Sequence, residues 1–178
     1  MADIMLDLET LATSPDSVVL TFGAVKFDPF NPDEEIDKGL YLRLDVDEQI
    51  SLGRAVDQGT IEWWATQPAD VREEALGDND RVSLDEFTRQ LNKFVSGASR
   101  IWAQGPVFDI VILENLYRQV GKPAPWAYYT IRDSRTLLKA LGDNRQAGRE
   151  AAHNALADCV YQAQAVRAAV SAYELKTL

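Results

Sequence analysis

The chain of 178 residues contains one cysteine, Cys159. A single thiol cannot form an internal disulfide, so the sequence gives no support for a disulfide framework or an oxidising compartment. Cys159 follows Asp158 within an apolar, helical pattern, and we expect a buried packing thiol rather than a nucleophile. A Gly-x-Ser-x-Gly elbow is also missing, which leaves little support for a serine or cysteine hydrolase.

Long apolar stretches are absent as well. No run approaches the ~20 residues that a bilayer-spanning helix needs, and the N-terminus lacks the basic start and apolar run of a signal peptide. The sequence therefore predicts a cytoplasmic protein with no membrane partner.

Basic charge is scarce: 18 Lys and Arg stand against 28 Asp and Glu, which gives a net charge of −10. This balance argues against broad electrostatic binding to a nucleic-acid backbone. It does not exclude an enzyme of nucleic acids, because carboxylates that hold divalent metals are partly neutralised by them. A protein that grips only a chain end also needs few phosphate contacts. Extended duplex binding is what the charge disfavours most.

The composition, 46% hydrophobic and 26% charged, is that of a globular protein, and we find no internal repeat or low-complexity linker. We therefore expect one domain over residues 1–178. The pattern predicts strands at 3–8, 18–27, 38–44, 100–103 and near 127–132. It predicts helices at 60–66, 68–76, from Ser83 to about 96, and at 108–120, 134–141 and 155–173. The first three strands indicate an antiparallel meander, and the later alternation of helices with strands indicates an α/β fold whose mixed sheet is flanked by helices.

Two carboxylates stand at i and i+2 on the first predicted strand, in Ile4-Met5-Leu6-Asp7-Leu8-Glu9. Alternation along a strand points Asp7 and Glu9 to the same face. Adjacent acids repel each other unless a cation lies between them. Taken alone, the pair is equally typical of a solvated strand end.

Three more ionisable residues are candidates for the same site, and each lies at or near the start of a predicted helix. Asp109 opens an apolar helix after Gly105-Pro106, where it could also simply favour the helix dipole. Asp158 lies inside an apolar helix, where a lone carboxylate would be costly. His153 is the only histidine, stands five residues before Asp158, and has an alternative interpretation as a loop or capping residue. Asn154 is the expected N-cap of the helix that carries Asp158.

In this order, Asp-x-Glu, Phe-Asp and His-x-x-x-x-Asp resemble the three exonuclease motifs of the DEDDh family, which belongs to the DnaQ-like, ribonuclease-H-like 3′–5′ exonucleases. The resemblance covers residues 4–167. Asp-x-Glu alone is not specific, whereas the full ordered set is. Residues 60–67, Thr-Ile-Glu-Trp-Trp-Ala-Thr-Gln, also resemble phage-type exonucleases such as the bacteriophage T4 exonuclease A type. A phage-encoded enzyme would act in the host cytoplasm.

The resemblance implies a ribonuclease-H-like sheet and two divalent ions, Mg²⁺ or Mn²⁺, which activate water and stabilise charge in phosphodiester hydrolysis. By this likeness Asp7 would bridge both ions, Glu9 and Asp158 would complete the water-holding site, and Asp109 would complete the second site. His153 would be the general base. The expected reaction removes nucleoside 5′-monophosphates from the 3′ end of single-stranded DNA.

Substrate contacts follow less directly. The family likeness points to Thr10 and Leu11, after the first motif, as contacts of the terminal nucleotide. Phe108 could stack on a base or sugar, or pack in the core. Gln104 stands where many relatives have asparagine or histidine, which bears on nucleotide preference. Asp133 is interpreted as a helix cap outside the site.

Adjacent indoles at Trp63 and Trp64 cannot both point into the core from one helix, so one could be a stacking platform for single-stranded nucleic acid.

Two alternatives remain open. An exoribonuclease or oligoribonuclease would use the same chemistry, and the 2′-hydroxyl contact that separates RNA from DNA is not visible in sequence. A non-catalytic nucleic-acid-binding module of the same fold is disfavoured by the complete set of motif residues. The sequence predicts a single-stranded 3′ end as partner and identifies neither a protein partner nor an oligomeric state.

Overall fold

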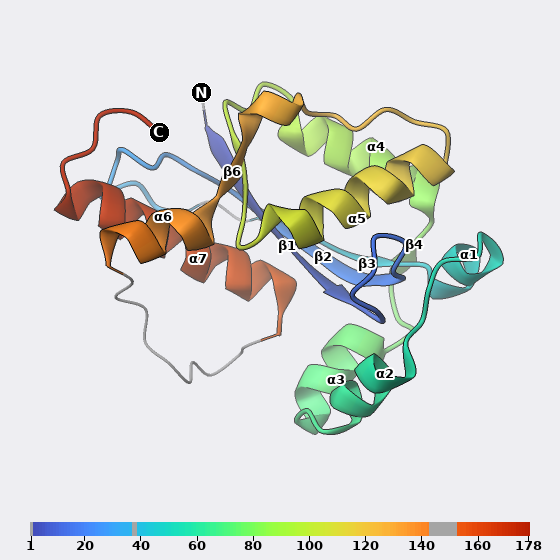
Figure 1. Ribbon diagram of the computed structural model, residues 1–178. Coiled ribbons are helices and arrows are strands. Elements are labelled where there is room, and N and C mark those ends of the chain that lie inside the picture. Colours follow the sequence, from blue (N-terminus) through green and yellow to red (C-terminus); the bar gives the residue numbers. More distant parts are fainter. Residues whose placement is uncertain (1, 37–38, 143–152) are drawn as a thin grey trace.

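A six-stranded mixed sheet organises the computed structural model, which describes residues 2–36, 39–142 and 153–178 (Figure 1). The sheet has the spatial order β4-β3-β2-β1-β5-β6. Strands β1, β2 and β3 pair antiparallel, whereas β5 and β6 run parallel to β1. This confirms the predicted meander followed by parallel strands. The strands are β1 (Asp3–Thr10), β2 (Val19–Phe27), β3 (Leu40–Leu44), β4 (Arg81–Val82), β5 (Ile101–Ala103) and β6 (Ile131–Asp133).

Three helices begin at caps that the sequence indicated. The side chains of Ser83, Asp133 and Asn154 accept hydrogen bonds from backbone N–H groups in the first turns of α4, α6 and α7. None of the described helices is long and apolar enough to cross a bilayer. The helices are α1 (Val46–Ser51), α2 (Gln58–Ala65), α3 (Ala69–Leu76), α4 (Leu84–Val95), α5 (Pro106–Gln119), α6 (Ser134–Leu141) and α7 (Ala155–Ala172).

Some short elements differ from the prediction. The strand expected near 127–132 is a 3₁₀ turn, Tyr128–Thr130, followed by β6, because the backbone N–H of Thr130 bonds back to the carbonyl of Ala127. Neither α1 nor β4 was predicted, since six and two residues are too few to show a period. The third strand begins at Leu40, and position 38 of its predicted range lies outside the described residues.

The two faces of β1 are covered by different helices (Figure 1). Ile4, Leu6 and Leu8 pack in one core cluster with residues of α4 and α5. Met5 packs in a second cluster with Cys159 and other residues of α7. Strict alternation therefore directs positions 7 and 9 to the same face of the strand, as predicted, and that face is the one covered by α7. Cys159 is fully buried, which confirms the expected packing thiol.

Close approach of α7 to the sheet depends on Gly23. This glycine is the ladder partner of Asp7 on the neighbouring strand. A Cβ atom at position 23 would lie 2.3 Å from the carbonyl carbon of Ala155, the first residue of α7. The Cys159 thiol donates a hydrogen bond to the Gly23 carbonyl at 3.2 Å. The first turns of α7 are thus seated directly beside the acidic end of β1.

Candidate active site

Three carboxylates converge where α7 meets the end of β1. Asp7 and Glu9 come from the strand and Asp158 from the helix, and one oxygen of each lies within 4.8 Å of the others. An all-oxygen donor set of this kind suits hard divalent cations such as Mg²⁺ or Mn²⁺. Residues from opposite ends of the sequence therefore form a group that could hold a metal ion.

The carboxylates of this group repel one another, so a nearby positive charge would stabilise their ionised forms. Burial raises the pKa of Asp7 well above its ordinary range, and the carboxylates of Asp109, Glu9 and Asp158 raise it further. Burial, together with Asp158 and Asp109, raises the pKa of Glu9 to about 8. Each shift reflects the cost of placing like charges together away from water. A bound divalent cation would remove that cost, so the donor set fits such an ion.

Asp109 belongs to the same cleft but not to the compact group. Gly105 adopts a positive φ of 130°, and Pro106 then opens α5, whose first turn contains Asp109. The carboxyl is buried, which raises its pKa to about 7 even though backbone hydrogen bonds and Arg135 lower it. Asp109 thus faces the cluster from α5, on the opposite layer to α7.

Gln162 is a member of the site that the sequence reasoning missed. Its Nε2 atom donates a hydrogen bond to Oδ1 of Asp7 at 3.0 Å. The side chain is buried, and among the described residues its Oε1 atom has no hydrogen-bond partner. The available signal was its place four residues after Asp158, which is one turn along the same helix face. Gln162 therefore holds the Asp7 carboxylate in one orientation.

His153 lies at the entrance to α7 in an unusual backbone conformation, with φ of 68°. Its backbone N–H donates to Oδ2 of Asp158 at 3.0 Å. Its imidazole meets the indole of Trp63 edge to face, with 4.8 Å between ring centroids, and the indole of Trp64 at 6.5 Å. The structure thus brings His153 to Asp158 through the backbone and to α2 through its ring.

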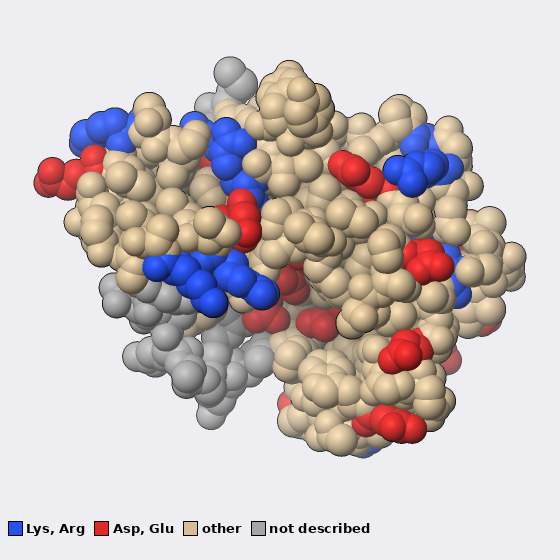
Figure 2. Space-filling view, in the orientation of Figure 1, with Lys and Arg blue, Asp and Glu red and all other residues tan. Residues whose placement is uncertain are grey.

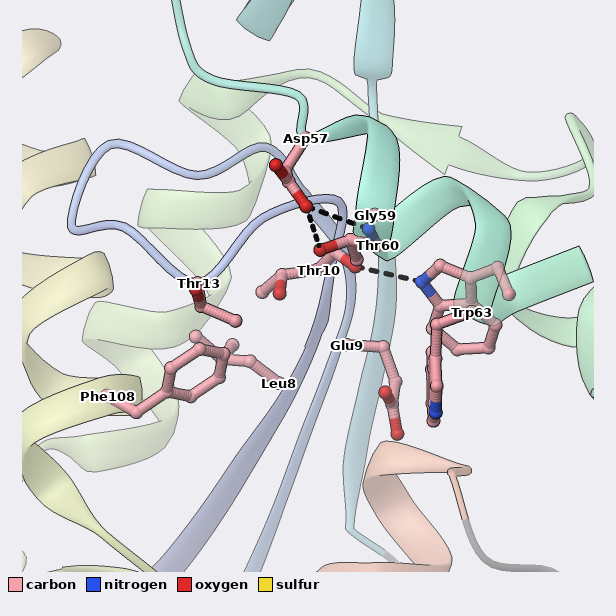
Figure 3. A pocket seen from close by; sticks show the side chains of 10 residues that line it. Leu8, Glu9, Thr10, Thr13, Asp57, Gly59, Thr60, Trp63 and Phe108 are labelled. Carbon is pink, nitrogen blue, oxygen red and sulfur yellow. Dashed lines mark hydrogen bonds between the residues drawn. The ribbon is translucent and has the colours of Figure 1, made fainter.

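A pocket of about 380 Å³ opens beside Glu9 (Figure 3). Phe108 and Trp63 stand on opposite sides of it, and Glu9 lies between them. Thr10 and Thr13 also line it. Asp57 lines the pocket on the side away from Glu9 (Figure 3). Its carboxylate accepts hydrogen bonds from the backbone N–H and the hydroxyl of Thr60 and so caps α2.

A second pocket of about 480 Å³ adjoins the first, since Leu8, Thr13 and Phe108 line both. It contains Asp7 and, further out, Arg135. Figure 2 shows carboxylates at the bottom of a hollow and basic side chains gathered beside it over α6. The remaining lining residues are Gln104, Gly105, Val107 and Asp109.

The predicted substrate contacts fall in different places. Thr10 lines the first pocket and Gln104 the second. Phe108 lines both pockets and also packs partly against the core. Leu11, by contrast, packs with Val18 and Leu20 in a separate cluster and is not brought to either of these pockets.

The two adjacent indoles separate as expected. Trp64 is 1% exposed and Trp63 is 40% exposed. Trp64 is therefore part of the core, and Trp63 is the more exposed of the two indoles that line the pocket beside Glu9.

Comparisons with known proteins identify relatives of this chain among nucleases. The sequence model of the 3′-5′ exoribonuclease Rv2179c-like domain matches residues 2–170. An exodeoxyribonuclease of Enterobacteria phage T4 is 26% identical over 166 residues, which cover 79% of this chain and 72% of the relative.

Solved structures show the same fold at low identity. Escherichia coli Exonuclease I in complex with a dT13 oligonucleotide gives a TM-score of 0.61 at 15% identity, covering 98% of this chain and 41% of that one. The chain therefore spans less than half of Exonuclease I. The nuclease domain of 3′hExo, a DEDDh family member bound to rAMP, gives a TM-score of 0.60 at 12% identity, covering 98% and 92%. Since the family match extends over nearly the whole sequence, the chain belongs to the 3′-5′ exoribonuclease Rv2179c-like domain family and is a 3′–5′ exonuclease.

Proposed function

We propose that this protein hydrolyses single-stranded DNA from the 3′ end, releases nucleoside 5′-monophosphates, and uses two divalent ions with His153 as general base. The observation that carries the proposal is the convergence of Asp7, Glu9 and Asp158 within 4.8 Å beside His153 and an open pocket. The DNA substrate is supported by the likeness to the phage T4 exodeoxyribonuclease. The proposed unit is a single domain over residues 1–178.

Asp7 is the proposed ligand of both ions, with Glu9 and Asp158 on the site that holds the attacking water and Asp109 on the other. Bound Mg²⁺ or Mn²⁺ would lower the pKa of that water and stabilise charge on the attacking and leaving oxygens. Gln162 fixes the Asp7 carboxylate through its 3.0 Å hydrogen bond. This support fits the general pattern in which groups behind the ligands orient them.

His153 is proposed to take the proton from the attacking water. A neutral imidazole nitrogen can accept a proton, and histidine is the side chain most often used as a general base. Its backbone contact with Asp158 ties the base to the carboxylate proposed to hold that water.

The terminal nucleotide is proposed to occupy the pocket beside Glu9 and Thr10, against the ring of Phe108. The preceding nucleotides would then cross the second pocket past Gln104 toward Arg135. A short basic edge next to an acidic centre suits a protein that grips a chain end, because few phosphates need to be neutralised. It also agrees with the strongly negative net charge.

RNA is the second candidate substrate, and the description of the matching family as exoribonuclease favours it. The metal chemistry is the same for both polymers, so the choice depends on contacts to the 2′-hydroxyl.

The test uses a 5′-labelled single-stranded DNA and the matching RNA, each with Mg²⁺, Mn²⁺ or EDTA. We expect a metal-dependent ladder that shortens from the 3′ end, faster on DNA. Faster shortening of RNA would establish the exoribonuclease instead. Asp7→Asn should abolish both reactions and weaken the thermal stabilisation by Mn²⁺, whereas Asp33→Asn, at an exposed turn position, should change neither. Binding without cleavage by folded, metal-loaded protein would indicate a non-catalytic module.

A further inference from the structure

We propose that Trp63 is a positioning residue for the reaction, because its indole fixes the imidazole of His153 in place. The inference rests on the proposed role of His153 as general base. It concerns a residue that stands 90 positions away in sequence and outside the three exonuclease motifs.

Within the described ranges, the aromatic contacts of the His153 ring are those with Trp63 and, at longer distance, Trp64. The His153 backbone takes a left-handed conformation, φ 68°, that residues other than glycine rarely adopt, and its N–H is held by Asp158. These features fix where the side chain starts but leave the rotation of the imidazole free. The edge-to-face contact with Trp63, at 4.8 Å and 86°, supplies a geometry in which aromatic pairs attract.

The indole of Trp63 is itself held against a rigid neighbour. It packs edge to face on Trp64 with 4.9 Å between centroids. Trp64 is buried, and its Nε1 atom donates to the carbonyl of Thr10 at 2.9 Å. Thr10 directly follows Glu9 on β1. A chain of contacts therefore connects the ring of His153 to the strand that carries the metal ligands.

Helix α2 is fastened to the same strand end at its N-terminus. The backbone N–H of Asp57 donates to the carbonyl of Leu11 at 2.8 Å, and the Asp57 side chain caps α2. The aromatic pair is thus carried by a helix anchored at both its cap and Trp64. Figure 3 shows Trp63 beside Glu9 at the wall of the pocket.

This arrangement predicts a specific kinetic signature. Trp63→Ala should lower kcat by about 10- to 100-fold, the usual penalty for a misplaced catalytic group, with little change in KM. Trp63→Phe keeps an aromatic face and should retain activity within about threefold, consistent with the modest value of one aromatic pair. Ile61→Ala removes another exposed apolar side chain from α2 and should leave kcat and KM unchanged.

A double-mutant cycle separates action through His153 from any other role. In a His153→Ala background the further change Trp63→Ala should have no additional effect on kcat, because the group it positions is already gone. Independent, multiplying effects would overturn the proposal. A raised KM with unchanged kcat in Trp63→Ala would also overturn it, and would assign Trp63 to nucleotide contact.

A second readout does not depend on activity. His153 is the only histidine, so in untagged protein its imidazole carbon-bound protons give uniquely identifiable NMR signals. Ring currents of the indole should displace these signals, and Trp63→Ala should return them toward the position of free histidine while the thermal unfolding curve remains cooperative. Unchanged signals would overturn the inference. If wild-type protein degraded no nucleic acid, the proposed function would fail, and the NMR signals would still decide whether Trp63 fixes the ring.

Discussion

Gly23 and Ala155 touch through their backbones: a Cβ atom on residue 23 would lie 2.3 Å from the carbonyl carbon of Ala155. The contact sits opposite Asp7 in the β1–β2 ladder and three residues before Asp158. The spacing between strand and helix at this point therefore sets the separation of the carboxylates.

Substitution of Gly23 by alanine should both destabilise the fold and weaken metal binding by the carboxylates beside it. We expect a loss of about 1–3 kcal/mol in the free energy of unfolding from overpacking, with a reduced Mn²⁺-induced rise in melting temperature and loss of nuclease activity. Gly97→Ala is the control: its positive φ of 77° makes it destabilising too, but it should leave the Mn²⁺ response intact. Equal Mn²⁺ responses in both variants would contradict this expectation.

His153→Ala should lower turnover by roughly 10²–10⁴-fold, the usual contribution of a general base. Metal binding should persist, because the proposed ligands are carboxylates. Single-turnover rates together with the Mn²⁺-dependent melting shift measure the two effects separately. Cleavage at the wild-type rate would show that another group accepts the proton.

Gln162→Leu should weaken metal binding while the protein still folds. The change removes the hydrogen bond to Asp7, and loss of a group that supports a ligand typically costs about 10- to 100-fold in metal affinity. Titration of activity against Mn²⁺ should show the midpoint moving to higher concentration, with much of the activity regained at saturation. Gln164→Leu changes an exposed residue of the same helix and should not move the midpoint.

Metal-free protein should lose stability as the pH rises from about 5 to about 8. The pKa of Glu9 is about 8 in the folded protein against 4.5 ordinarily, so in this window the folded state binds more protons than the unfolded state. The free energy of unfolding then falls with pH, on the order of a few kcal/mol over the window. Burial of Asp109, whose pKa is about 7, acts in the same direction.

Urea unfolding at several pH values in EDTA measures this slope, and added Mg²⁺ should flatten it by stabilising the ionised carboxylates. Glu9→Gln should also reduce the slope, because amide nitrogen does not titrate there. Metal-free stability that increased across the same window would be incompatible with the buried acid cluster.

The sequence predicts the sheet and the acid cluster because those depend on local pattern and order. Alternation along β1 places Asp7 and Glu9 on one face, and Asn154 caps α7 as expected. Contacts between segments that are distant in the sequence could not be predicted from a single sequence. Nothing in the sequence around His153 points to Trp63, and the place of Leu11 away from the pocket depends on packing against Val18 and Leu20.

Gly23 is a second case in which the sequence alone does not give the reason for a residue. A glycine inside a strand is expected to destabilise that strand, and only the position of α7 explains why no side chain fits at residue 23. The local sequence specifies the strand, whereas the partner that excludes a Cβ comes from a segment more than a hundred residues away.

The acid cluster draws Asp7 and Glu9 from the first strand and Asp158 from the last helix. During synthesis the strand emerges long before the helix, so a growing chain holds only part of this acid cluster. On the proposed assignment of these carboxylates, hydrolysis would require α7 to be docked on β1 and β2. A nascent or partly unfolded molecule would then lack the assembled group that is proposed to hold the metal ions.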